Sequence, residues 1–204
     1  LGAGAFSYPV AGTTPNVGRV VWPDGNAIWA MDFIVTGTSI QVLPKVKVFD
    51  GILNSLDLSR DGSTLYVSGY SDSFPAIKAV TIASNSTSDL YVGATAGSFF
   101  FTVEASDNAV YADLSLPANT GHQLLRIELP CVGTCADVLA ANAAPVYPAA
   151  NSTSSIVAYS DYLAGSNNCW QLKYLDVSGV TPTQVFDGGQ PRYGTRSSWY
   201  GDMV

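Results

Sequence analysis

The stretch that decides the fold is residues 59–67 (SRDGSTLYV), a tight turn followed by an apolar strand. Asp and Gly let a chain reverse within two residues, because Gly adopts positive φ and Asp accepts hydrogen bonds from amides just downstream. The strand that follows carries one aromatic residue, Tyr66, among aliphatic neighbours. This pattern predicts a β-hairpin whose aromatic side chain packs in a core.

The same pattern recurs along the chain. Residues 22–30 (WPDGNAIWA), 105–112 (ASDNAVYA) and 154–159 (SSIVAY) align with it. The spacing is about 45 residues, which is room for four short strands and their turns. We expect the aligned aromatic residues to pack between neighbouring sheets as equivalent core positions: Trp29, Tyr66, Tyr111 and Tyr159.

Two further markers follow each aromatic strand in a constant order. The first marker is an apolar strand with a central charged residue or pair of polar residues, found at 76–82 (AIKAVTI), 122–129 (HQLLRIEL) and 170–177 (WQLKYLDV). The second marker is the sequence VFDG, found at 48–51 and 185–188. Three ordered markers favour a repeat architecture over a chance succession of strands.

The last repeat resembles the repeat of TolB-like β-propellers. It contains YSD at 159–161, LD at 175–176, FDGG at 186–189 and SWYGD at 198–202, in the order of that family's strands and turns. It departs from the family pattern at Phe186 and in the last turn, where Tyr-Gly-Asp replaces Ser-Pro-Asp-Gly. The resemblance extends at repeat level over residues 19–204 and implies a propeller fold without a particular function.

We therefore expect an all-β fold, a β-propeller with about four blades and the start of a fifth; a β-sandwich is the alternative, because any all-β chain shows frequent turns. Residues 1–18 lie outside the repeats and are expected to add an outer strand to the last blade or to a neighbouring subunit. The expected divisions of the chain are 1–18, 19–51, 52–96, 97–145, 146–198 and 199–204.

One stretch departs from the strand pattern. Residues 135–144 (CADVLAANAA) are rich in Ala and precede Pro145, which cannot continue a helix. This composition predicts one or two helical turns.

Composition excludes several classes of partner. The net charge is −7, only 12% of the residues are charged, and the pI is near 4.3. Such a surface repels phosphate backbones and anionic lipid, so we expect no nucleic-acid partner. No run of 18 apolar residues occurs, so we expect no membrane insertion.

Several residues favour an extracellular or cell-surface location. Asn85 and Asn151 begin Asn-x-Ser/Thr sequons and are predicted glycosylation sites. Cys131 and Cys135 flank a short Val-Gly-Thr loop and are predicted to form a disulfide, with unpaired thiols as the alternative. Cys169 is expected to be a buried free thiol. The chain begins at Leu1, which fits either removal of a signal peptide or a segment of a longer protein.

The sequence contains no recognisable catalytic or ligand-binding motif. The single histidine, His122, accompanies no nucleophile elbow, and it shows no zinc-ligand spacing with the cysteines. Phosphate-binding glycine loops are absent. We expect no catalytic, cofactor or metal site.

The function expected from these observations is that of a non-catalytic extracellular propeller, which binds protein or carbohydrate at a propeller face or serves structural assembly. Two alternatives remain. One is a part of a larger propeller enzyme, such as a lactonase-like hydrolase or a peptidase-associated propeller. The other is a self-assembling filament or surface-layer subunit joined through strand edges.

Overall fold

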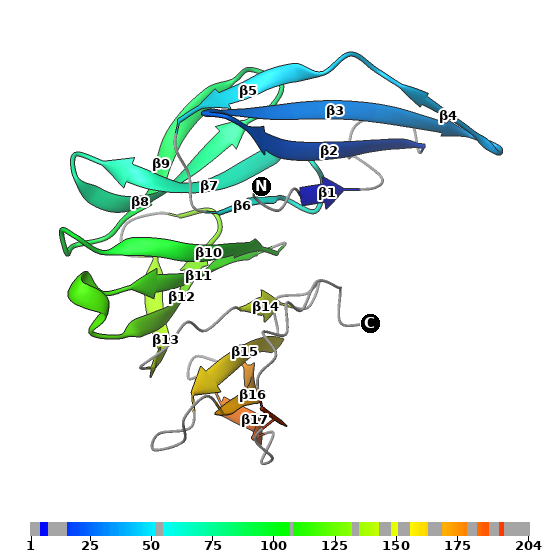
Figure 1. Cartoon of the computed structure of the whole chain (residues 1–204). Coiled ribbons are helices and arrows are strands. Elements are labelled where there is room, and N and C mark those ends of the chain that lie inside the picture. Colours follow the sequence, from blue (N-terminus) through cyan, green and yellow to red (C-terminus); the bar gives the residue numbers. More distant parts are fainter. Residues whose placement is uncertain are drawn as a thin grey trace.

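The computed structural model describes the chain as a succession of antiparallel sheets (Figure 1). It describes residues 5–7, 16–51, 55–106, 108–131, 135–142, 148–150, 156–162, 169–178, 183–187 and 192–193. Within them the structure is strands and turns, with one short 3-10 turn, η1 (Pro117–Asn119). The all-β prediction is therefore confirmed.

Four sheets follow each other along the chain, and their strands are as follows. The first contains β1 (Ala5–Ser7), β2 (Val17–Asp24), β3 (Ala27–Thr36), β4 (Ser39–Val42) and β5 (Val46–Asp50). The second contains β6 (Leu56–Leu58), β7 (Thr64–Ser71), β8 (Phe74–Thr81) and β9 (Ser86–Val92). The third contains β10 (Phe99–Ala105), β11 (Ala109–Ser115), β12 (His122–Glu128) and β13 (Ala136–Asn142). The fourth contains β14 (Ala149–Ala150), β15 (Ile156–Tyr162), β16 (Cys169–Asp176), β17 (Thr183–Asp187) and β18 (Arg192–Tyr193).

Each sheet packs face to face on the next, so that the core is divided among the interfaces. Val21 and Ile28 of the first sheet cluster with Leu65 and Val67 of the second. A second cluster lies between the second and third sheets. A third cluster lies between the third and fourth sheets. Figure 1 shows the sheets succeeding each other from β2–β5 to β15–β17, which is a propeller-type arrangement and not a two-layer sandwich.

Partly buried polar side chains also join the second and third sheets. Ser55 Oγ accepts a hydrogen bond from the Val103 amide at 3.1 Å, and Asp57 Oδ2 accepts one from the Ala105 amide at 2.6 Å. These amides lie on β10, the first strand of its sheet. Side chains of one sheet thus satisfy backbone donors on the edge of the next, which fixes the two sheets relative to each other.

The first sheet departs from the expected repeat. Tyr66 and Tyr111 lie on β7 and β11, the second strands of their sheets, whereas Trp29 lies on β3, the third strand. The Asp24-Gly25 turn therefore joins the second and third strands, whereas the Asp61-Gly62 turn joins the first and second. Gly25 (φ 64°) and Gly62 (φ 71°) both adopt positive φ, so the two hairpins share turn chemistry without sharing a place in the sheet.

Two local expectations are wrong. Residues 5–7 form β1 and pair with β2 of the first sheet, not with the last sheet. Residues 136–142 form β13, a strand that pairs with β12, where one or two helical turns were expected. The edge of β12 offers this segment a ladder of backbone pairs, interrupted by one register shift between Leu124 and Leu125, and that tertiary context overrides the helix propensity of Ala.

Candidate binding surface on the first sheet

Apolar side chains occupy most of one face of the first sheet, and Asp24, Lys47 and Asp50 lie on the same side next to Ala27 and Trp29. Strand register places Trp22 opposite Trp29 and Val35 opposite Ile40, all pointing to the same side because facing residues of antiparallel strands share a side. We call this surface the tryptophan face. Its residues are Val20, Trp22, Trp29, Met31, Phe33, Val35, Ile40 and Val42.

The two faces of this sheet differ in burial. Val21, Ile28 and Ala30, on the face that packs on the second sheet, are 0%, 0% and 1% exposed. On the tryptophan face, Ile40 is 66% exposed and Val42 is 56% exposed, and the other side chains are partly exposed. None of the eight belongs to the buried clusters formed by the described residues.

Glycine and lysine complete the geometry of this face. The Phe33 ring lies across Gly18 on the neighbouring strand, where an added Cβ would come within 2.1 Å of Phe33 Cζ. Only glycine leaves room for that ring without displacing it. The Lys45 ammonium lies 4.3 Å from the centroid of the Trp29 ring and forms a cation–π contact there. The face thus offers aromatic and aliphatic area bordered by positive charge.

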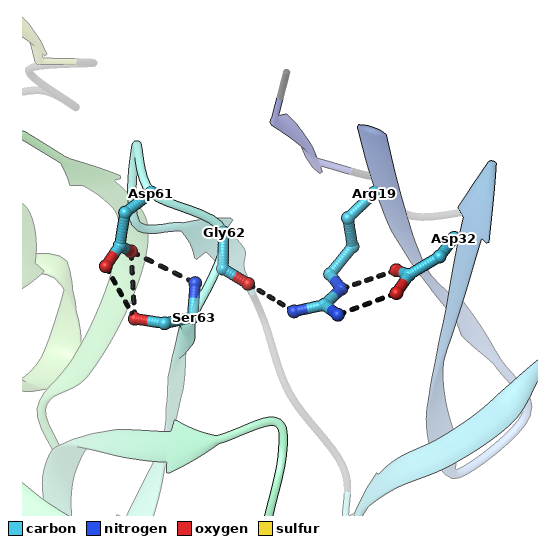
Figure 2. A network of polar contacts seen from close by, with 5 residues as sticks. All are labelled: Arg19, Asp32, Asp61, Gly62 and Ser63. Carbon is cyan, nitrogen blue, oxygen red and sulfur yellow. Dashed lines mark hydrogen bonds and ion pairs between the residues drawn. The ribbon is translucent and has the colours of Figure 1, made fainter. Parts of the chain in front are cut away.

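An ion pair on the opposite face holds the first sheet against the second (Figure 2). Arg19 Nε and Nη2 donate to the two carboxylate oxygens of Asp32 at 2.6 and 2.8 Å. The remaining nitrogen, Arg19 Nη1, donates to the Gly62 carbonyl at 2.5 Å. A bidentate Arg–carboxylate pair is rigid, so it fixes the angle at which the tryptophan face is presented.

The turn that receives Arg19 is itself ordered by Asp61. Its carboxylate accepts hydrogen bonds from Ser59 Oγ, from the Ser63 amide and from Ser63 Oγ. Partial burial of Asp61 acts to raise its pKa, but the hydrogen bonds from Ser59 and Ser63 outweigh it and hold the pKa below its ordinary value.

The predicted core aromatics occupy two kinds of place. Tyr66, Tyr111 and Tyr159 are 7%, 0% and 5% exposed and belong to the clusters between sheets. Burial raises the pKa of Tyr66 and of Tyr111 above the ordinary value. Trp29 lies instead on the tryptophan face. Richness in β-branched and aromatic residues predicted its strand but not which side of that strand a neighbouring sheet covers.

The other predicted residues are spread over the molecule. Asn85 is exposed in the turn between β8 and β9, with φ 53°. Cys131 and Cys135 are joined by a disulfide across a Cα–Cα distance of 5.4 Å. Asn151 and residues 199–204 lie outside the described residues, as does the side chain of Cys169.

A buried acid–base pair on the third sheet was not expected from the sequence. His122 Nδ1 lies 2.8 Å from Asp113 Oδ1, and Ser115 faces His122 across the strand pair. These residue types also occur in hydrolytic triads. Here Asp113 and Ser115 are 0% exposed and His122 is 7% exposed, so the three side chains are buried.

Two further features are absent from the described part of the chain. No group of three or more His, Cys, Asp and Glu residues is gathered there as a metal site would require. No helix there has the length and apolar character needed to cross a membrane.

Several solved structures share this fold. TolB from Acinetobacter baumannii matches with a TM-score of 0.56 and 11% identity, over 91% of this chain and 43% of that chain. The putative TolB from Agrobacterium tumefaciens matches with a TM-score of 0.52 and 13% identity, over 89% and 80%. A chain of the nidogen/laminin complex matches with a TM-score of 0.55 and 8% identity, over 86% and 63%.

These matches confirm the resemblance to TolB-like β-propellers at the level of fold. The chain spans less than half of the first of these structures and less than two thirds of the nidogen/laminin chain. No protein-family model matches the sequence, and no characterised protein matches it in a sequence comparison.

Proposed function

We propose that this chain is a non-catalytic propeller-type module that assembles with protein through its tryptophan face, and that the partner is a second copy of the chain. The observation that supports this most is the exposure of Ile40 and Val42 at the end of an otherwise continuous apolar sheet surface. Monomeric soluble proteins seldom expose large contiguous apolar patches, and where such patches occur they mark interaction sites.

A β-sheet is the partner whose chemistry fits this face. In the same chain, Leu65 and Val67 of the second sheet pack against the first, and Val110 and Ala112 of the third pack against the second. The tryptophan face is the corresponding side of the first sheet, for which the described residues contain no preceding sheet. Twisted sheets with apolar faces interdigitate well when stacked.

A second copy provides such a sheet by symmetry. Two tryptophan faces placed together form an isologous contact, in which the same patch is used by both subunits, and this arrangement closes as a dimer. The eight side chains of the face carry no charge, and the carboxylates of Asp24 and Asp50 lie on the same side next to Ala27, at the opposite end of β3 from Ile40 and Val42.

Two further observations support a protein-binding role outside the cytoplasm. A fold of this type occurs in the nidogen/laminin complex, which is a protein–protein complex. The Cys131–Cys135 disulfide suits an oxidising compartment, because thiols are kept reduced in the cytosol.

The dimer is tested with charged substitutions at the exposed end of the face. Lys at Ile40 and Val42 of both subunits places four ammonium groups in the isologous contact and removes four apolar side chains, each worth about 1.5–3 kcal/mol when buried. We expect the wild type to be a dimer by sedimentation velocity, and the I40K/V42K variant to dissociate at least ~100-fold more readily.

Val138→Lys is the matched control, because Val138 is 57% exposed on β13 of a different sheet. It should leave the dimer intact. Far-UV circular dichroism of all three proteins checks that the strands are retained. A wild-type monomer at every concentration, or equal dissociation of I40K/V42K and V138K, contradicts the proposal.

A further inference from the structure

A surface groove of about 410 Å³ lies at the rim between the first and second sheets. Its walls come from β5 on one side and from β8, the following turn and β9 on the other. Clefts that hold small ligands start at about 300 Å³. Its lining residues are Lys47, Val48, Phe49, Asp50, Lys78, Asn85 and Thr87.

The groove contains both functional positions of a sequon. Asn85 and Thr87 are the first and third residues of Asn85-Ser86-Thr87, and both are exposed. Asn85 lies in the β8–β9 turn with φ 53° and is exposed. A glycan-transferring enzyme needs this access to the amide.

One contact orients the Asn85 amide along the groove. Asn85 Nδ2 donates to the Lys47 carbonyl at 3.3 Å, across the boundary between the two sheets. Attachment of a sugar to Nδ2 replaces one of its two hydrogens, so the other remains to donate this bond. A sugar on Nδ2 therefore starts beside β5, where Phe49 is partly buried and offers part of its ring.

We propose that Asn85 carries an N-linked oligosaccharide whose first sugar lies in this groove. The amide nitrogen of Asn85 forms a bond to the anomeric carbon of a lipid-diphosphate-linked oligosaccharide. The bond from that carbon to the diphosphate oxygen breaks, the lipid diphosphate leaves with the electron pair, and the amide loses one proton. The groove residues then hold the sugar by apolar contact with Phe49 and by hydrogen bonds from lysine.

The site is tested by intact mass spectrometry of the full chain secreted from a eukaryotic host, before and after treatment with an amidase that removes N-glycans. We expect a glycan mass on the wild type, on T87S and on N151Q, because each keeps the Asn85 sequon. The mass of that glycan should be lost in N85Q and T87A. Both residues are exposed, and T87A keeps Asn at the positive-φ position 85, so the loss of the glycan is tested without changing the residue at that position of the turn.

An unchanged mass in N85Q overturns the assignment. So does an unmodified wild type secreted beside a marker protein that is glycosylated in the same cells. The placement in the groove has its own readout, acylation of lysine amines in the glycosylated and the enzymatically deglycosylated protein. Lys47 should react several-fold more slowly while the glycan is present, and Lys45, on the tryptophan face, should react equally in both. Equal reactivity of Lys47 overturns the placement.

Discussion

Asp61 shows how one carboxylate shapes the contact between two sheets. It accepts hydrogen bonds from Ser59 and Ser63 and so holds the turn whose Gly62 carbonyl receives Arg19. Because Asp61 lies at the surface, we expect this carboxylate to contribute less than ~1 kcal/mol to stability. Its importance lies in orienting the carbonyl that Arg19 reaches.

The pKa of Asp61 makes that contribution dependent on pH. Since the pKa is lower in the folded chain than in the unfolded chain, the stabilisation is complete above the unfolded value and is lost as the pH falls through the folded value. We expect D61N to lower the free energy of unfolding near neutral pH, and the difference from wild type to shrink between about pH 5 and about pH 3. Urea unfolding across that range measures it. A difference that grows on acidification contradicts this account of the turn.

Local structure can be predicted from a single residue pair where few other residues can adopt the conformation that is required. An Asp-Gly pair predicts a tight turn because few residues tolerate positive φ, and both Gly25 and Gly62 adopt it. The same pair does not specify which hairpin it closes. His122 shows a second limit, because its partner Asp113 is set by the register of β11 and β12, which no local pattern encodes.

At the scale of elements, aliphatic side chains together with a few buried rings pack between the sheets. Tyr111 is fully buried between the third and fourth sheets, so Tyr111→Ala removes a ring from a closely packed interface. We expect the loss to be about 3–5 kcal/mol in the free energy of unfolding. Chemical denaturation monitored by circular dichroism measures it.

Tyr70→Ala is the control for that change. Tyr70 is 51% exposed near the β7–β8 turn, and its truncation should stay within about 0.5 kcal/mol of wild type. Equal losses at the two positions mean that the third and fourth sheets do not pack as described.

Strand β13 shows that pairing with a neighbouring strand can override the conformational preference of the segment itself. The strands at 27–33 and 64–68 are predicted because these stretches are rich in β-branched and aromatic residues and are bounded by turn residues. The Ala-rich segment at 136–142 lacks that composition, and its strand depends on pairing with β12. A pairing partner distant in sequence cannot be inferred from the composition of one segment.

At the scale of the molecule, the propeller-type fold follows from the ordered repeat, since each unit covers one face of the unit before it. That rule predicts three covered interfaces for four sheets, and the structure contains three. It also predicts one apolar face without a preceding sheet. The sequence does not reveal that the two tryptophans gather there, because this depends on the shift of Trp29 from the second to the third strand.

The most direct test of the proposed assembly is photocrosslinking from within the tryptophan face. A photoreactive phenylalanine derivative is placed at position 40 in one sample and at position 138 in another, and the products are analysed by mass spectrometry. The account predicts crosslinks from position 40 to residues of β2–β4 in a second copy, and none between copies from position 138. Crosslinks from position 40 that stay within one chain, or that occur between copies equally from both positions, contradict it.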